Sequence, residues 1–222
     1  MKHIVVDLEM NIIAKSHKEA RRLAGMEVIE IGAVVLDDAY QEIGSFMTYV
    51  KPQYNDEIEK KYAKLTGITT EMVQEAPVFE DALRQFLSWC AGISGEKRIY
   101  QWSGSDLAQI RQEAALKQPD LDEQQQALLQ DWADFQEEYG EKLGMDRALS
   151  LKDAVMYAGV DFEGRPHDAL CDARNTATLL EIVRTPEKCS QALAHVIEAL
   201  TPKTVGSTLG EMFNFGELLL VS

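Results

Sequence analysis

Cysteine is scarce in this chain of 222 residues. Its three cysteines, Cys90, Cys171 and Cys189, are odd in number, lie far apart and form no CxxC pair. A disulfide framework needs paired cysteines, and zinc sites use closely spaced ones. The sequence therefore argues against both and fits a reducing compartment, so we expect a cytoplasmic protein.

Long hydrophobic runs are also missing. No window approaches the length of a membrane span, and residues 1–10 lack the charged, apolar and small-residue regions of a secretory signal. Apolar residues make up 45% of the chain and charged residues 27%, which is typical of a globular protein. We therefore expect no membrane partner.

Positive charge is in short supply. The chain has 22 lysines and arginines against 37 aspartates and glutamates, for a formal net charge of −15. Tight, non-specific binding to long nucleic acid relies on a basic surface, so this balance speaks against it. A site that holds one strand end through bound cations is still compatible with the composition, because divalent ions offset negative charge locally.

Strand and helix patterns alternate along the chain. β-branched residues predict strands over 27–37 and 41–50, joined by a turn as an antiparallel hairpin, and a short strand over 98–102. The polar segment 118–130 is expected to form an exposed helix or loop. Helical spacing predicts helices over 55–65, from 69, and over 79–93, 106–117, 131–142, 151–158, 168–184 and 187–200.

The order of these elements favours one α/β domain over residues 1–184. Residues 185–222 are then a C-terminal extension, which either packs on the domain or mediates self-association. We find no internal repeat and no Gly/Ser linker.

Two carboxylates follow the first apolar run, Ile4-Val-Val6. Asp7 and Glu9 are two residues apart, so their side chains project from one face of a strand, whose end we expect there. Like charges held this close raise each other's pKa unless a cation lies between them. A metal ion, Mg²⁺ or Mn²⁺ given the hard oxygen ligands, is one interpretation. The other is an exposed strand end with two solvated acids.

Three further polar residues lie near predicted helix starts. Asp106 follows the turn at 103–105, where a carboxylate is favoured as a cap. His167 precedes the helix over 168–184, and Asp172 follows it by five residues. Positions five apart do not share a helical face, so the pair is not a metal motif of the HExxH kind. A histidine on the entering loop can instead face Asp172 from outside the helix; a capping or partly exposed histidine is the alternative.

Together, Asp7-x-Glu9, Asp106 and His167-x4-Asp172 resemble the DEDDh (DnaQ-like) exonuclease superfamily, closest to the branch of ERI-1-like and sporulation-inhibitor-like 3′→5′ exonucleases. The resemblance covers about residues 1–184. It is supported by Val28-Ile-Glu30-Ile-Gly-Ala33, Leu65-Thr-Gly-Ile68, Phe162-Glu-Gly-Arg-Pro-His167 and Asp172-Ala-Arg-Asn-Thr-Ala177.

The resemblance implies an RNase H-like α/β fold, with a mixed sheet flanked by helices. It implies a metal-dependent exonuclease that acts on single-stranded 3′ ends, RNA in preference to DNA, and releases nucleoside 5′-monophosphates. Two divalent cations, Mg²⁺ or Mn²⁺, would be bound by the four carboxylates, and His167 would be the general base. The chemistry agrees, because two metals about 3.5–4 Å apart clamp the attacking and leaving oxygens of a phosphodiester, and an imidazole can act as a base near neutral pH.

Two alternatives stay open: a non-catalytic nucleic-acid-binding or scaffold module with the same fold, and an endonuclease or phosphatase on the same metal site. The sequence departs from the family at Met10-Asn11, where relatives usually carry a small hydroxyl residue, so the resemblance leaves nucleotide preference open here but not metal binding. Asp168 is a second departure, and we expect it to face solvent.

Other side chains have less specific interpretations. Glu30 is either a satisfied buried acid or a support for the metal ligands. The basic residues at 15, 18, 21 and 22 either contact phosphates near the rim of the site or form a solvated face. The tryptophans, Trp89, Trp102 and Trp132, are expected in the core.

Overall fold

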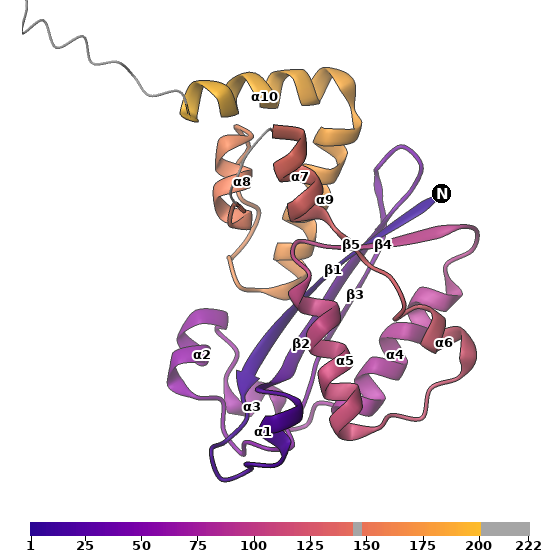
Figure 1. The fold of residues 1–222 in the computed structure, drawn as a ribbon, viewed down its shortest axis with the longest axis vertical. Helices are drawn as coiled ribbons and strands as arrows, with labels where there is room; N and C mark the ends of the chain where they lie inside the picture. The colour runs from indigo at the N-terminus through magenta and orange to yellow at the C-terminus, as the bar shows by residue number, and fades with distance from the viewer. Residues whose placement is uncertain (144–147, 201–222) are drawn as a thin grey trace, which may run out of the picture.

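The computed structural model describes residues 1–143 and 148–200 of the chain. Within these ranges a mixed five-stranded sheet has the order β3-β2-β1-β4-β5 (Figure 1). The first three strands are antiparallel, whereas β4 and β5 run parallel to β1. The strands are β1 (Lys2–Ile12), β2 (Met26–Leu36), β3 (Glu42–Tyr49), β4 (Lys97–Gln101) and β5 (Ala133–Asp134).

Helices cover both faces of this sheet. On one face α4 and α5 pack against β1 and β2, and on the other α9 crosses the same two strands with α7, α8 and α10 behind it (Figure 1). The helices are α1 (Ala20–Leu23), α2 (Lys60–Thr66), α3 (Thr70–Val73), α4 (Phe79–Gly92), α5 (Ser105–Lys117), α6 (Glu123–Ala127), α7 (Phe135–Leu143), α8 (Leu151–Tyr157), α9 (Ala169–Arg184) and α10 (Pro186–Leu200).

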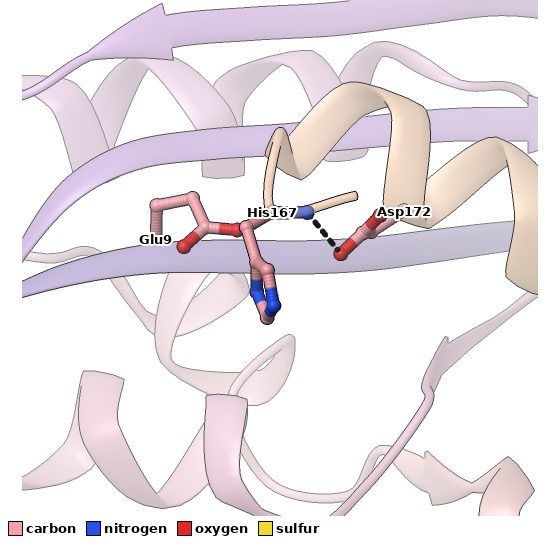
Figure 2. A group of neighbouring side chains, drawn as sticks. All are labelled: Glu9, His167 and Asp172. Carbon is pink, nitrogen blue, oxygen red and sulfur yellow. Dashed lines mark hydrogen bonds between the residues drawn. The ribbon is translucent and has the colours of Figure 1, made fainter. Parts of the chain in front are cut away.

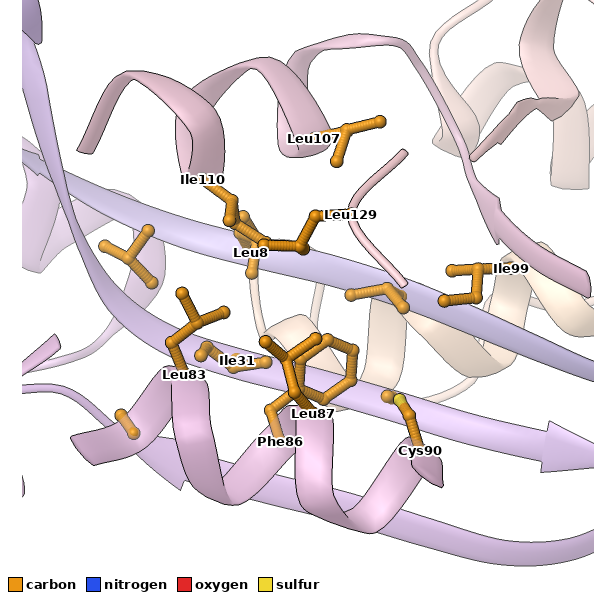
Figure 3. Close-up of a cluster of buried hydrophobic side chains, with 14 of the residues drawn as sticks. Leu8, Ile31, Leu83, Phe86, Leu87, Cys90, Ile99, Leu107, Ile110 and Leu129 are labelled. Atoms are coloured by element: carbon orange, nitrogen blue, oxygen red, sulfur yellow. The ribbon is translucent and has the colours of Figure 1, made fainter. Parts of the chain in front are cut away.

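The two faces of β1 contribute side chains to different hydrophobic clusters. Ile4, Val6 and Leu8 point toward α4, where Phe86 and its neighbours bury one apolar stripe of that helix (Figure 3). Val5 points the other way, toward α9. A strand covered on both faces reads as a continuous apolar run, which explains the start of this sequence. The first polar residues of β1 therefore lie in the interior of the protein.

Two element boundaries differ from the sequence prediction for one reason. Strand β1 continues to Ile12, so Asp7 and Glu9 lie within it and not at its end. The helix expected over 55–65 begins only at Lys60. The fully buried Asn11 side chain explains both, because it donates to the Glu57 carbonyl (3.0 Å) and accepts from the Glu59 N–H (3.1 Å). These bonds extend β1 and hold residues 57–59 out of the helix.

Most of the remaining elements follow the prediction. The helix expected over 131–142 is an exception, because it begins only at Phe135, after residues 133–134 pair with β4 as strand β5. The hairpin of β2 and β3, the short strand β4 and the long helices α4, α5 and α9 lie within two residues of their expected bounds. The polar segment 118–130 contains α6, which begins with a capping box formed by Asp122 and Gln125. Trp102 and Trp132 are buried, and Trp89 packs against the same core, as expected.

The C-terminal helix α10 packs against α9 and α8. The expected division of the chain at residue 184, and a role of the extension in self-association, stay predictions. The tail 201–222 lies outside the described residues. None of the described helices combines the length and the apolar composition needed to cross a membrane.

Candidate active site

The close approach of α9 to the sheet forms one wall of the site. Gly32 of β2 lies opposite Asp7 of β1. A Cβ atom at Gly32 would lie 2.3 Å from the backbone of Ala169 and Leu170, which begin α9. Glycine is therefore required here so that the first turn of the helix can rest on the strands. This contact brings Asp172, in that first turn, over the carboxylates of β1.

A β-bulge lies beside the site. Glu9 pairs with Glu30, but the next residue of β1, Met10, pairs with Val28, so that Ile29 is an extra residue in β2. Bulges increase the local twist and re-aim the side chains around them. Here Glu30 lies on the face that α9 covers, and its carboxylate accepts a hydrogen bond from the Ala169 N–H at 3.1 Å.

Asp106 reaches the site from the other side. Strand β4 pairs in parallel with β1 as far as Val6 and then ends, and the following turn starts α5 beside Asp7. The Leu107 N–H donates to Gln101 Oε1 and fixes this turn. Asp106 is buried, only 4% exposed. The parallel pairing of β1 and β4 thus places Asp106 next to β1, although the two are 100 residues apart.

Glu9, His167 and Asp172 converge most closely. Each offers one ligand atom, a carboxylate oxygen or an imidazole nitrogen, and these atoms lie within 4.8 Å of one another (Figure 2). The His167 backbone N–H donates to Asp172 Oδ2 at 3.2 Å. The other oxygen, Asp172 Oδ1, is buried and has no hydrogen-bond partner among the described residues.

The four carboxylates share one electrostatic environment. Burial raises the pKa of Asp7 well above its ordinary value, and the charges of Asp106, Asp172 and Glu9 raise it further. Burial, followed by the charge of Asp172, raises the pKa of Glu9 to about 8. Burial likewise raises the pKa of Asp106 to about 7 and that of Asp172 to about 6. Ion pairs between described residues involve none of the four.

His167 presents its imidazole at the surface of this cluster. Its side chain is exposed, and its backbone has a φ of +62°, in the left-handed region that non-glycine residues seldom adopt. Partial burial and the charge of Arg165 lower the pKa of the imidazole. The neutral ring, which can accept a proton, is therefore favoured near neutral pH.

Two side chains have structural roles in this region that the sequence did not define. Asp168 is half-buried and is the N-cap of α9, since its Oδ1 accepts from the Cys171 N–H at 3.0 Å, a role that the sequence prediction of a solvent-facing acid did not include. Glu30 is a buried acid, and burial raises its pKa to about 7. Its hydrogen bond to Ala169 makes it a satisfied buried acid and also a support for the helix that carries Asp172.

The Asn11 side chain is fully buried against residues 57–59, which leaves it no exposed surface for direct contact with a nucleotide. Met10 is half-buried and packs against the core on the opposite face of β1.

The basic residues after β1 lie around a separate cavity of about 650 Å³. His17, Lys18 and Arg22 line it together with Tyr54 and Leu116, and none of the five candidate site residues does so. Arg21 instead donates to the Ile13 carbonyl. A contact of these residues with phosphates stays a prediction.

Comparison with known proteins gives one family. The family model RNase_T, described as Exonuclease, matches residues 4–180. ERI1 exoribonuclease 2 of Danio rerio is 31% identical over 183 residues, which cover 73% of this chain and 32% of that protein. The chain spans between a quarter and about half of the length of its curated relatives of this kind.

Solved structures share the fold. The nuclease domain of 3'hExo, described as a DEDDh family member bound to rAMP, has a TM-score of 0.70 at 22% identity and covers 82% of this chain and 90% of its own. S. pombe Pop2p, described in a Mg²⁺- and Mn²⁺-bound form, has a TM-score of 0.61 at 17% identity, with 83% of each chain covered. These likenesses confirm the predicted RNase H-like sheet flanked by helices.

Proposed function

The chain belongs to the RNase_T exonuclease family, and from this premise we propose that it is a divalent-metal-dependent 3′→5′ exonuclease. It removes nucleoside 5′-monophosphates from single-stranded 3′ ends, RNA in preference to DNA. The observation that carries the proposal is the convergence of Glu9, His167 and Asp172, whose ligand atoms lie within 4.8 Å of one another. Asp172 Oδ1 is buried without a hydrogen-bond partner among the described residues, and the charges of Asp106, Asp172 and Glu9 all raise the pKa of Asp7.

The residues present fit a pair of hard dications. Asp7, Glu9, Asp106 and Asp172 provide only oxygen donors, which Mg²⁺ and Mn²⁺ prefer. Burial of several carboxylates without a nearby cationic side chain raises their pKa values, and bound dications remove this repulsion. Pop2p, with the same fold, is described with these two ions. When bound, two such ions stabilise the negative charge on the attacking and leaving oxygens.

His167 provides the base. Its neutral imidazole takes the proton of a water molecule whose oxygen attacks the terminal phosphorus. The bond from phosphorus to the 3′ oxygen of the preceding nucleotide then breaks, and that oxygen takes a proton from solvent, which leaves a nucleoside 5′-monophosphate and a new 3′-hydroxyl end. The lowered pKa of this imidazole keeps it in the accepting form, and its exposure lets water and a strand end reach it.

The substrate class is supported by the relatives and by the charge of the chain. The curated relative is named an exoribonuclease, and the 3'hExo domain is described with rAMP bound. A net charge of −15 disfavours a broad electrostatic grip on long nucleic acid. A site that takes one strand end needs no such grip.

A time course on matched single-stranded RNA and DNA oligonucleotides labelled at the 5′ end tests the proposal. We expect Mn²⁺- or Mg²⁺-dependent shortening from the 3′ end, faster on RNA and stopped by EDTA. Asp7→Asn should abolish it while the melting temperature is kept. Cleavage of a 3′-blocked substrate would indicate an endonuclease, and binding without cleavage would indicate a non-catalytic module.

A further inference from the structure

We propose that Arg165 is a positioning residue, which holds His167 over the carboxylate cluster by hydrogen-bonding to the C-terminal end of α2. Residues 64–67, about 100 residues earlier in the chain, contact its guanidinium. The inference rests on the proposed function, because it takes His167 as the base.

A single side chain makes the contact between the His167 loop and α2. Arg165 Nη2 donates to the backbone carbonyls of Lys64 (3.2 Å) and Leu65 (3.0 Å). Both carbonyls belong to the last turn of α2, where carbonyl groups lack helical partners and a cation is favoured. The connection between α8 and α9, which carries Arg165, descends to α2 in Figure 1.

Gly67 leaves room for the Arg165 guanidinium because it has no Cβ atom. It ends α2 with a φ of +75°, and a Cβ atom there would lie 1.5 Å from Arg165 Nη1. A side chain at this position would therefore displace the arginine. The glycine allows the sharp turn and, at the same time, direct contact with Arg165.

The backbone of His167 needs this support. Pro166 joins it to Arg165 and restricts the chain between them, while His167 itself has the uncommon φ of +62°. On the side of α9 the loop is held by Asn175, which exchanges two hydrogen bonds of 2.9 Å with Glu163, and by the bond from the His167 N–H to Asp172. Arg165 provides the opposite anchor. Without it, the loop is tied on one side only.

The location of Arg165 allows its positioning role to be tested without disturbing the hydrophobic core. Its side chain is exposed and lies outside the hydrophobic clusters. Arg111 offers a matched control, because its guanidinium also donates to two backbone carbonyls, those of Leu129 and Gln130. It lies on α5, five residues after Asp106, and none of these bonds reaches the loop that carries His167.

Steady-state kinetics of the full chain on a labelled RNA, with Mn²⁺, gives the first test. Arg165→Ala should lower kcat by about 10- to 100-fold with KM little changed, because a displacement of about 1 Å at the reacting groups can cost that much. Arg165→Lys should restore part of the rate. Arg111→Ala should leave kcat unchanged. A kcat for Arg165→Ala equal to that of the wild type overturns the inference, as does an equal loss in Arg111→Ala.

A double-mutant cycle shows through which residue Arg165 acts. In a His167→Ala background, Arg165→Ala should cause no further loss of kcat, since the group it positions is gone. Multiplicative losses contradict the proposal. Gly67→Ala should reproduce the effect of Arg165→Ala and add nothing to kcat when combined with it; melting temperatures confirm that these variants fold.

A spectroscopic readout is independent of catalysis. The imidazole NMR signals of His167, assigned by their loss in His167→Ala, should shift or broaden in Arg165→Ala but not in Arg111→Ala. Unchanged signals in Arg165→Ala overturn the inference even if the chain has no nuclease activity. Absence of metal-dependent activity in the wild type, in contrast, counts against the proposed function alone.

Discussion

Glu30 of β2 accepts a hydrogen bond from the backbone N–H of Ala169, the first residue of α9, across 139 positions of sequence. This bond fixes the turn of α9 that holds Asp172 above Glu9, and Glu30 itself is buried. The strand therefore orients the helix through a side chain that need not touch substrate or metal.

Two substitutions of Glu30 distinguish its role as a hydrogen-bond acceptor from the role of its charge. Glu30→Ala leaves the Ala169 N–H without a partner, so we expect a loss of about 1–3 kcal/mol in the free energy of unfolding, measured by denaturant titration, and a weaker metal affinity. Glu30→Gln keeps an acceptor and should retain most activity. A fully active and stable Glu30→Ala variant would show that the bond has no such role.

Gly32 should tolerate no side chain. In Gly32→Ala the Cβ meets the backbone of Ala169 and Leu170 at 2.3 Å, so α9 must move away from β1. We expect destabilisation on the order of 1–3 kcal/mol and loss of activity. Gly92→Ala, where the added Cβ meets nothing within 4 Å, is the control and should behave as the wild type. Equal behaviour of the two variants in thermal unfolding and in activity would refute the packing argument.

The raised pKa values predict how stability depends on pH without metal. The ordinary pKa of Glu9 is 4.5 and its folded-state pKa is about 8, so the folded protein keeps a proton that the unfolded chain releases. The free energy of unfolding should therefore fall as pH rises from about 5 to about 8, by about 1.4 kcal/mol for each pKa unit of difference between the two states.

Denaturation at several pH values in EDTA measures this dependence. The buried His3 and the exposed His167 both have lowered pKa values and act in the opposite direction, so the difference between wild type and Glu9→Gln isolates the carboxylate. The variant should lose less stability over the same range, and Mg²⁺ should reduce the loss in the wild type. A wild-type curve that rises more steeply than that of Glu9→Gln would contradict the assignment.

Asn11 should matter for stability and not for nucleotide choice. Asn11→Ala leaves the Glu59 N–H and the Glu57 carbonyl unpaired, so we expect a loss of about 1–3 kcal/mol. Relative rates on RNAs that differ only in the 3′-terminal base should stay the same, because the side chain is fully buried. A changed base preference together with unchanged stability would contradict this prediction.

The sequence predicted those features that depend on local pattern. Apolar periodicity located most of the strands and helices. Motif order named five residues, of which the structure brings Glu9, His167 and Asp172 within 4.8 Å of one another. It missed features set by contacts between distant residues. Asn11 lies 46–48 positions from its partners, and its bonds moved the ends of β1 and α2.

Other misses have the same origin. The capping role of Asp168 depends on where α9 begins, and a helix start is uncertain by a residue or two from sequence. The contact between Arg165 and Gly67 joins two segments whose spatial proximity the sequence does not reveal. The partnerless oxygen of Asp172 depends on burial, which no single segment determines.

The central claim is that carboxylates from β1, α5 and α9 hold two dications. Titration of Mn²⁺ into the metal-free full chain, followed by calorimetry, measures this without any substrate. We expect two bound ions per chain in the wild type and in Asp81→Asn, an exposed α4 control, and impaired binding in Asp7→Asn and Asp172→Asn. Wild-type affinity and stoichiometry in Asp172→Asn, or no binding by the folded wild type, would contradict the account.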